Sequence, residues 1–453
     1  MTTPEEPGVY PDPADGGAGA MAGAAEPGAS GAEPRAARPL ARLRTQLALK
    51  IGAPLALLPN ERVLCTEVIF QAIIDAGVMS FLSVFLVRLG APTWLVGLYS
   101  SLPALVIIVS VLPMGAFVQR QRNLVATVNW GRFIYRTILG MFAFLPILPP
   151  TVAPYILVGA RSAVSVPMSA VDVSFTTILG RAVAPHRRPT LLSTRLAING
   201  LAAALAGFLA GQWLDRVAYP LNYQVLFASS FVAGLGSIYV LSHLKLPEQR
   251  IAPAASRRFN LSAMVTLLRG APAFRRYSAA SFVYRLSMSM PSALYAVYRV
   301  RTLGASDAWI GILLTVERFL SVFAYFGLGR FLARPEHRRW LWASTLGVSL
   351  YPLLTSVATT PEMLLLPAVA GGIFGAGSNI FLTNTLLQVS TEEERPTFAA
   401  ANSFLANICG FAGPLIGTFL ADAVGIVPAL VVIGVLRILG GLAFGRLGVG
   451  QER

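Results

Sequence analysis

The chain has 453 residues, of which 55% are hydrophobic and only 13% carry a charge, and its mean hydropathy is +0.64. Because an ordinary soluble domain contains about 25% charged residues, this composition excludes a water-soluble globular protein and indicates an integral membrane protein. The net charge of +15 comes almost entirely from arginine, since Lys50 and Lys245 are the only lysines. The basic residues lie in short loops between apolar runs and form no single basic domain, which argues against nucleic acid as a partner.

The first 62 residues precede the apolar part of the chain. Residues 1–38 are rich in Gly, Ala, Pro and Glu and contain no apolar run, which predicts a disordered tail and fits neither a signal peptide nor a membrane span. Residues 39–62 mix leucine with arginine and lysine. This pattern predicts an amphipathic lead-in on the cytoplasmic membrane surface, and a plain juxtamembrane linker fits it equally well.

Twelve apolar runs follow, and most have the roughly 20 residues that a helix needs to cross the hydrocarbon core. The runs lie near 63–87, 95–118, 124–147, 153–182, 190–214, 222–244, 277–298, 308–331, 340–358, 363–389, 397–421 and 424–447. The sequence does not show the segments of about 10 residues with alternating hydrophobicity that are typical of a transmembrane barrel. We therefore predict an all-α integral membrane protein.

The chain also repeats itself. Residues that recur 214 positions later are Leu89-Gly90-Ala91, Gly97, Gly115, Phe117 and Arg120, matched by Leu303-Gly304-Ala305, Gly311, Gly329, Phe331 and Arg334. Residues that recur 207 positions later are Thr176, Leu179, Arg188-Pro189-Thr190 and Asp215, matched by Thr383, Leu386, Arg395-Pro396-Thr397 and Asp422. The repeat predicts two pseudo-symmetric six-helix halves, 63–244 and 277–447, with a cytoplasmic linker at 245–276 and a short tail at 448–453. Two such halves are typical of a carrier whose substrate site lies between them.

The distribution of arginine predicts the orientation. One set of loops contains most of the basic residues, namely Arg120 and Arg122; Arg181, Arg187 and Arg188; the stretch 245–276; Arg330, Arg334, Arg338 and Arg339; and Arg395. The opposite set contains only Arg88, Arg216, Arg299 and Arg301. The first set should therefore be cytoplasmic, together with both termini. We expect a multi-pass protein of the plasma (inner) membrane.

The loop after the second apolar run carries a family signature. It reads GAFVQRQRN at 115–123, and Gly329 and Arg334 form a fainter copy in the second half. With twelve spans in a 6+6 repeat and a long basic central loop, this sequence resembles the major facilitator superfamily over about residues 60–450. Gly115 and Arg120 match the family motif, while Gln119 stands where the family usually has Asp. The resemblance implies a gating loop formed by Gly115, Arg120, Gly329 and Arg334.

Several ionisable residues fall inside the predicted spans. A charge at the bilayer centre costs about 2.5–3.5 kcal/mol, so such side chains should face the bundle interior, a partner or water. Asp75 lies about 18 Å into the first span and Asp172 about 15 Å from the cytoplasmic end of the fourth, near the midplane. The repeat counterpart of Asp172 is Asn379. Glu67 lies two turns before Asp75, on a similar face.

The basic residues in the spans are Arg132, Arg136, Arg161, Arg285, Arg318 and Arg437. Each of these acidic residues and arginines has two interpretations. It either lines the cavity or forms a structural ion pair that holds helices together. Because Arg318 directly follows Glu317, their side chains point about 100° apart, and at most one need face a cavity. Arg437 is interpreted as lying near a helix end, where it snorkels or pairs.

In the superfamily, spans 1, 4, 7 and 10 line the central cavity. The resemblance therefore implies a substrate cavity bounded by eight residues, Gln71, Asp75, Arg161, Asp172, Tyr284, Arg285, Tyr295 and Asn379. The two tyrosines are the least specific members, because aromatic residues in a span often only pack.

These features predict a secondary active transporter that moves a small solute by alternating access. The three histidines lie in loops, so a coupled proton would have to bind a carboxylate. The candidates are Asp75 first, with Glu67, Asp172 and Glu317 as the others. An uncoupled facilitator, and a membrane sensor or assembly factor that retains the carrier fold without transport, remain open as alternatives.

The sequence also lacks the motifs that would indicate nucleotide hydrolysis, metal binding or catalysis. The sequence has no Gly-x-x-x-x-Gly-Lys-Ser/Thr phosphate loop, no metal-ligand cluster and no catalytic Ser/His spacing. We therefore expect no enzyme, no cofactor and no metal. The expected partners are the lipid bilayer, a small-molecule substrate and, with coupling, protons, and we expect a monomer. The sequence does not specify the substrate or the direction of transport.

Overall fold

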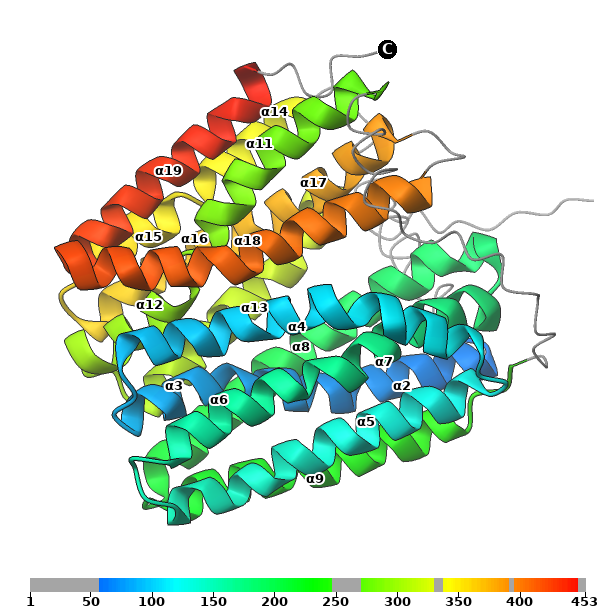
Figure 1. The fold of residues 1–453 in the computed structure, drawn as a ribbon, viewed down its shortest axis with the longest axis horizontal. Coiled ribbons are helices and arrows are strands. Elements are labelled where there is room, and N and C mark those ends of the chain that lie inside the picture. The colour runs from blue at the N-terminus through cyan, green and yellow to red at the C-terminus, as the bar shows by residue number, and fades with distance from the viewer. Residues whose placement is uncertain (1–56, 247–269, 330–336, 391–394, 447–453) are drawn as a thin grey trace, which may run out of the picture. The chain divides into compact units, whose positions relative to one another are not determined.

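The computed structural model describes residues 57–246, 270–329, 337–390 and 395–446. All regular secondary structure in these residues is helical, and the predicted all-α class is confirmed (Figure 1). The predictions that lie outside the described residues concern the tail 1–38, most of the lead-in 39–62, most of the linker 245–276, Arg334 and the tail 448–453.

In the described residues, the N-terminal half has a helical segment for each of the first six predicted spans. The segments are α2 and α3 (Pro59–Ile74 and Ser80–Arg88), α4 (Thr93–Gln119), α5 (Leu124–Met141), α6 and α7 (Ala153–Ala163 and Ser165–Ala182), α8 (Arg188–Arg216) and α9 (Leu221–Ser242). A 3-10 turn at Phe142–Ile147 extends α5.

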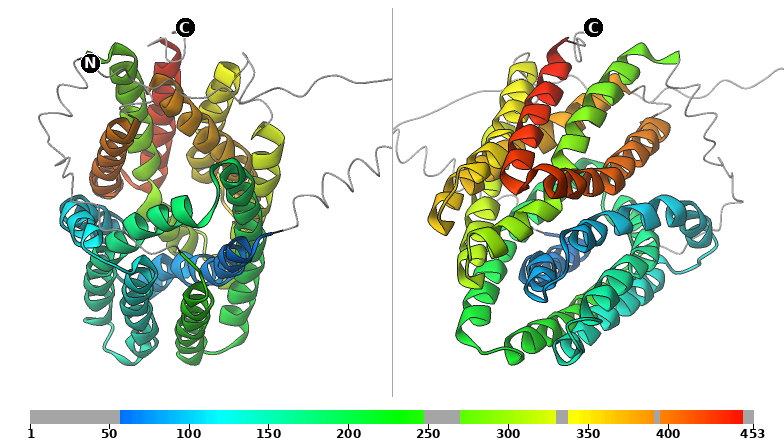
Figure 2. Two further views of the ribbon diagram at one scale, coloured as in Figure 1. Left: turned by 90° about the vertical axis from the view of Figure 1, so that its right-hand side faces the viewer. Right: turned by 60° about the vertical axis from the view of Figure 1, so that its left-hand side comes forward.

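The C-terminal half repeats this arrangement. Its segments are α11 and α12 (Pro272–Ser289 and Ser292–Val297), α13 (Asp307–Gly329), α14 and α15 (His337–Gly347 and Leu350–Ser356), α16 and α17 (Leu365–Ala370 and Ala376–Val389), α18 (Arg395–Val424) and α19 (Ile426–Arg446). In the further views of Figure 2 most helices of the C-terminal half, coloured yellow to red, lie on one side of the helices of the N-terminal half, coloured blue to green.

Nine of the helical segments among the described residues are long and apolar enough to cross a membrane. The predicted spans that are not among the nine are 124–147, 277–298 and 340–358. Their helices carry arginines or serines, or are broken by a turn, which lowers the mean hydropathy or the continuous length. Each packs within its own half: α5 against α9, α11 against α19, and α15 against α19. Neighbouring helices therefore shield the least apolar spans.

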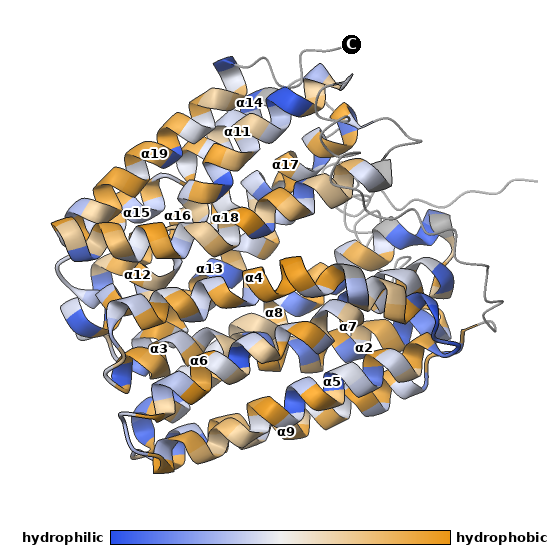
Figure 3. Ribbon diagram, in the orientation of Figure 1, coloured by the Kyte–Doolittle hydropathy of each residue, from blue (hydrophilic) through white to orange (hydrophobic). Residues whose placement is uncertain are grey.

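The outer helix surfaces are apolar. Figure 3 shows hydrophobic residues along the helices and hydrophilic residues mainly near their ends. Large apolar side chains such as Val109, Val232 and Phe323 are exposed in mid-helix positions. On a soluble protein such a surface would aggregate, whereas on a membrane protein it faces hydrocarbon.

Helix pairs that follow the repeat join the two halves. α8 of the N-terminal half packs against α13, and α4 packs against α18. Repeat-related glycines lie at both interfaces: a Cβ on Gly311 would lie 2.7 Å from the Gly207 carbonyl oxygen, and a Cβ on Gly97 would lie 2.7 Å from Thr418 Oγ1. Close backbone approach through small residues is the usual way in which membrane helices associate. The repeat thus supplies the same packing device twice.

A second pair of repeat-related glycines, Gly90 and Gly304, determines the conformation of two turns. Gly90, after α3, has a φ of 80°, and Gly304, after α12, has a φ of 60°. Both values lie in the left-handed region that glycine adopts without a steric penalty. The recurrence of Leu-Gly-Ala in the sequence therefore reflects one turn geometry used twice.

Three helical spans contain a π-helical turn. The turns are Asp75–Met79 in the first span, Tyr298–Thr302 in the seventh and Gly371–Gly375 in the tenth. The fourth span is divided between α6 and α7 at Val164. These are the four spans that the family resemblance assigns to the cavity. Extra residues in a helical turn re-aim side chains and occur often at functional sites.

We predict that Gly311→Ala destabilises the contact between the halves. The new methyl group would lie 2.7 Å from the Gly207 carbonyl oxygen, and overpacking of this kind typically costs about 1–3 kcal/mol. Thermal unfolding of the purified protein in detergent should show a lower Tm than the wild type.

Gly159→Ala is the matched control. Gly159 lies inside α6, and a Cβ there meets no atom within 4 Å. Alanine is the better helix former, so this variant should keep or raise the Tm. Equal Tm values for the two variants would contradict the proposed close approach of α8 and α13.

Candidate functional site

A cavity of about 280 Å³ lies where the two halves meet. Ser80, Ser83 and Val84 of the first span line it from the N-terminal half. The C-terminal half contributes lining residues from α11 through α19, including Tyr295, Arg299, Glu317, Tyr351 and Arg437. We call this the Arg299 cavity. Of the predicted cavity residues, it contains Tyr295, and it also contains Glu317, which was predicted only as a proton carrier.

A second cavity of about 390 Å³ adjoins the first, because Met288 and Gly375 line both. Its other lining residues are Tyr284, Arg285, Ser289, Ser378, Asn379, Leu382 and Ala406. We call this the Arg285 cavity. It brings together three predicted residues from α11 and α17, namely Tyr284, Arg285 and Asn379. The two cavities together follow the seventh and tenth spans.

Arg437 is the most deeply placed cation of the Arg299 cavity. It lies in the middle of α19 and is 2% exposed, so the interpretation that placed it near a helix end is wrong. Its Nη1 donates to the Val348 carbonyl at 3.2 Å and its Nη2 to the Ser287 carbonyl at 3.0 Å. These carbonyls hold the guanidinium in position without neutralising its charge.

Arg299 reaches the same cavity from the π-helical turn of the seventh span. Its Nη2 donates to Tyr351 Oη at 2.5 Å, and its guanidinium lies 5.9 Å from the centre of the Tyr295 ring. Among the described residues, no carboxylate lies within 4.0 Å of the guanidinium of Arg299 or Arg437. Glu317 therefore lines the cavity without forming an ion pair with either arginine.

The N-terminal half contains a buried ion cluster around Glu67. This carboxylate is 0% exposed and accepts from Arg132 Nη1 at 2.6 Å and from Arg195 Nη2 at 3.2 Å. Arg132 also donates to Ser237 Oγ at 3.1 Å. Both guanidinium groups lie near the Phe175 ring, at 5.3 and 5.1 Å from its centre. Four helices, α2, α5, α8 and α9, are tied together by this cluster.

Asp75 lies at the end of a chain of hydrogen bonds that starts near this cluster. Arg136 Nη2 donates to Gln71 Oε1 at 2.8 Å, and Gln71 Nε2 donates to Asp75 Oδ1 at 3.0 Å. Unlike Glu67, the Asp75 side chain is exposed. Arg318 of α13 interacts with it electrostatically from the other half. Asp75 thus has an accessible carboxylate near both halves and no ion pair within 4.0 Å among the described residues.

Four of the predicted cavity residues line neither cavity, namely Gln71, Asp75, Arg161 and Asp172. Asp172 on α7 is exposed and interacts electrostatically with Arg132. Arg161 on α6 is half-buried, and its Nε has no hydrogen-bond partner among the described residues. Asp172 and its repeat counterpart Asn379 are both exposed, on α7 and α17. Their roles stay predictions.

The sequence analysis missed a polar cluster that joins the halves. Arg88 donates to Asp307 Oδ1 through Nε and Nη2, at 3.1 and 3.0 Å. Tyr223 Oη donates to Asp307 Oδ2 at 3.2 Å, and the Asp307 amide donates to Asp215 Oδ1 at 2.9 Å. Arg301 donates to the Ala91 carbonyl across the same boundary. The available signal was an arginine at the end of the first span and an aspartate at the start of the eighth, on one predicted side.

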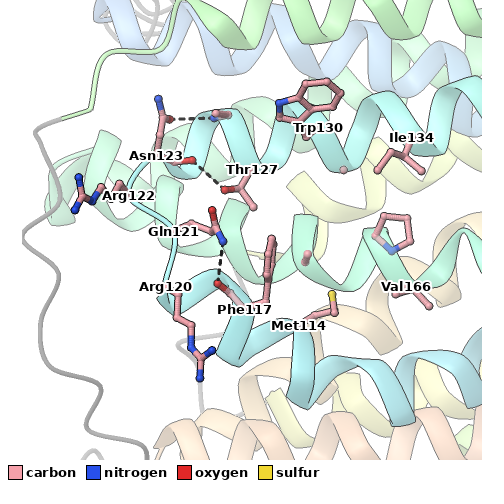
Figure 4. Close-up of a pocket in the computed structure, with 14 residues that line it drawn as sticks. Met114, Phe117, Arg120, Gln121, Arg122, Asn123, Thr127, Trp130, Ile134 and Val166 are labelled. Carbon is pink, nitrogen blue, oxygen red and sulfur yellow. Dashed lines mark hydrogen bonds between the residues drawn. The ribbon is translucent and has the colours of Figure 1, made fainter.

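A larger groove of about 830 Å³ lies elsewhere, between α4, α5 and α7 (Figure 4). All of its lining residues belong to the N-terminal half, so it is not between the halves. Figure 4 shows Arg120 and Arg122 at one end and Trp130 and Ile134 further along α5. Trp130 is 67% exposed. The groove therefore has an exposed aromatic side chain on its rim.

The gating-loop residues lie at helix ends and are only partly described. Gly115 is in the last turns of α4, and Arg120 caps that helix with its side chain exposed. Gly329 ends α13, and Arg334 lies outside the described residues. The gating role of these residues stays a prediction.

Comparisons with known proteins agree with this architecture. Residues 277–450 match the sequence model of the Major Facilitator Superfamily. No curated protein sequence matches the chain. Among solved structures, a bacterial homolog of the human lysosomal transporter Spinster, in an inward-facing and occupied conformation, is similar to it (TM-score 0.65, 12% identity, 86% of this chain and 96% of that chain covered).

Two further structures are similar. The nucleoside transporter NupG gives a TM-score of 0.66 at 10% identity, with 86% of this chain and 100% of that chain covered. The human organic anion transporter MFSD10 gives 0.59 at 15% identity, with 84% and 99% covered. At these identities the likeness concerns the fold. The chain therefore has the fold of these transporters, and its C-terminal half also matches the superfamily in sequence.

We predict that Glu67→Gln strongly destabilises the protein. The change leaves Arg132 and Arg195 without their shared buried carboxylate, and removing one partner of a buried pair costs about 3–5 kcal/mol. Asp75→Asn is the control on the same span, because its exposed carboxyl accepts only from Gln71 among the described residues. Thermal unfolding in detergent should separate the two variants, and equal Tm values would contradict a structural role for Glu67.

We predict that Asp307→Asn opens the predicted extracellular side. The change removes the ion pair with Arg88. A loss of about 1.5–3 kcal/mol for a charge-assisted contact would raise the open population about 10- to 100-fold. Pulsed electron paramagnetic resonance between labels at Ala218→Cys and Thr359→Cys, one on each half, should show longer distances.

The labelling requires a background without Cys65 and Cys409, which are buried. Glu362→Gln is the control, since Glu362 is an exposed carboxylate on the same predicted side. It should leave the distance distribution unchanged. If Asp307→Asn leaves the distance distribution unchanged, as the control should, the Asp307 cluster does not hold the predicted extracellular side closed.

Proposed function

We propose that the chain is a secondary active transporter of a small solute that works by alternating access in the plasma membrane, with both termini in the cytoplasm. The observation that carries the proposal is the cavity lined by both halves, next to helix pairs that approach through glycines. The match of residues 277–450 to the sequence model of the Major Facilitator Superfamily supports it. The fold likeness to transporters, including one recorded in an inward-facing state, supports it further.

The polar cluster around Asp307 supports a closed predicted extracellular side. Asp307 contacts three residues of the N-terminal half, Arg88, Asp215 and Tyr223. The contacts at Gly97 and Gly311 lie in the first turns of α4 and α13, near the same helix ends. Rocking about these contacts would expose the cavity to one compartment and then to the other.

The substrate path would follow the two adjoining cavities. In this proposal Tyr284, Arg285 and Asn379 contact the solute in the Arg285 cavity, and Tyr295 contacts it in the Arg299 cavity. The predicted residues of the N-terminal half, Gln71, Asp75, Arg161 and Asp172, would complete the path from the facing side.

Asp75 is the proposed proton carrier. A carrier must gain and lose a proton in contact with water, and Asp75 is exposed whereas Glu67 is fully buried between two arginines. Arg318 reaches Asp75 electrostatically from the other half. Movement of the halves would therefore change the field at this carboxylate and couple its protonation to the transport cycle. Asp172 and Glu317 are the remaining candidates.

We predict that Asp75→Asn abolishes uptake driven by a pH gradient but retains solute exchange. Asparagine cannot exchange a proton, yet it keeps the hydrogen-bond acceptor for Gln71. The measurement is proteoliposome uptake, with a solute found by thermal-shift screening, with and without an imposed pH gradient. Asp172→Asn, in the fourth span, is the parallel variant. Undiminished gradient-driven uptake in Asp75→Asn would remove Asp75 from the role.

The same assay distinguishes the alternative functions. Uptake that ignores the pH gradient in the wild type indicates an uncoupled facilitator. Solute binding without flux indicates a sensor or assembly factor on the carrier fold. Solute-dependent proton flux, followed with a pH-sensitive dye inside the vesicles, supports the coupled transporter.

A further inference from the structure

The Arg299 cavity contains more hydrogen-bond donors than the described residues satisfy. Three buried polar atoms on its lining have no hydrogen-bond partner there, namely Arg299 Nε, Arg437 Nε and Tyr295 Oη. A buried donor without a partner costs about 1–3 kcal/mol, and more when it is charged. Such groups in one cavity indicate a binding site for a molecule that supplies acceptors.

The net charge of the Arg299 cavity also indicates a ligand that supplies hydrogen-bond acceptors. Its acidic and basic lining residues are Arg299, Arg437 and Glu317, which together give a net charge of +1 when all three are ionised. Arg437 is 2% exposed, and its guanidinium donates to two backbone carbonyls. Burial of a cation without a counter-charge is unfavourable. An anion in the cavity would remove this penalty.

The elements around the cavity hold the donors in place. Tyr351 Oη accepts from Arg299 Nη2 at 2.5 Å, which leaves Nε of that guanidinium free. The carbonyls of Val348 and Ser287 fix Arg437 in the same way. Guanidinium groups present paired donors that match carboxylate and phosphate oxygens. The site is therefore preorganised for an oxyanion.

We propose that the transported solute carries an anionic group, a carboxylate or a phosphate, which binds between Arg299, Arg437 and Tyr295. This inference rests on the proposed transport function and adds the chemical class of the substrate. Arg285 in the adjoining cavity provides a further cation on the path, held by a bond from its Nε to Ser281 Oγ at 2.9 Å. With volumes of about 280 and 390 Å³, the two cavities fit a small organic anion.

The test measures binding to the purified full-length protein. Benzoate, succinate and glucose 6-phosphate are compared with their neutral counterparts benzamide, succinamide and glucose, at constant ionic strength. The Tm should rise with at least one anion and with none of the neutral compounds. The carboxylate and phosphate arms show which oxyanion the site prefers.

Tyr295→Phe is the decisive variant, because it removes only the hydroxyl and leaves both guanidinium groups in the cavity. We expect the Kd for the stabilising anion to rise about 10- to 100-fold, as for the loss of one hydrogen bond to a charged group. Arg299→Gln should weaken binding at least as much. Arg437→Gln is less informative, since it also removes the bonds to Val348 and Ser287.

Arg216→Gln is the matched control. Arg216 is exposed at the end of α8 and donates to Gln212, so its loss should leave the Kd unchanged. The proposal is overturned if no anion of the panel stabilises the protein, if the neutral compounds stabilise it equally, or if Tyr295→Phe and Arg299→Gln bind the anion like the control.

Vesicle flux separates this inference from the proposed function. Anion binding that depends on Tyr295 and Arg299 without any flux retains the anion site and contradicts transport. Flux of neutral or cationic solutes without anion binding retains transport and contradicts the anion site.

Discussion

A charge inside a bilayer must find a counter-charge, hydrogen bonds or water, and this constraint orders the polar residues of the chain. Glu67 meets it by accepting from two arginines, in a cluster that ties four helices of one half together. Arg437 meets it only in part, through two backbone carbonyls. In the first arrangement the Glu67 carboxylate is paired without a ligand, so we interpret this cluster as structural. The second is incomplete, and it lies in a cavity lined by both halves.

The duplicated sequence explains how the halves can move as units. Gly97 and Gly311 occupy equivalent positions in the repeat and lie at the two interfaces, α4 with α18 and α8 with α13. Glycine surfaces let helices approach closely without interlocking side chains. The contacts within the N-terminal half include buried ion pairs, and those between the halves include glycine surfaces. Rigid-body motion of the halves is therefore the expected mode of change.

The sequence predicts the fold well because span length, charge placement and repetition are local signals. The Leu-Gly-Ala recurrence marked turns in which Gly90 and Gly304 both have positive φ. Predictions for individual polar residues were weaker, since a sequence does not show which helix faces another. Arg437 was assigned to a helix end but lies mid-helix. Asp307 went unnoticed because its partners, Arg88 and Asp215, are about 90 to 220 positions away.

The most direct test of the account asks whether one cavity reaches both compartments in turn. Ser292 lines the Arg299 cavity and is exposed, so Ser292→Cys in a background without Cys65 and Cys409 reports access. A membrane-impermeant thiol reagent is added to either side of oriented vesicles. The account predicts reaction from each side, with Asp307→Asn raising the rate on one side and lowering it on the other. Reaction from a single side only, or rates that rise together on both sides, would contradict alternating access.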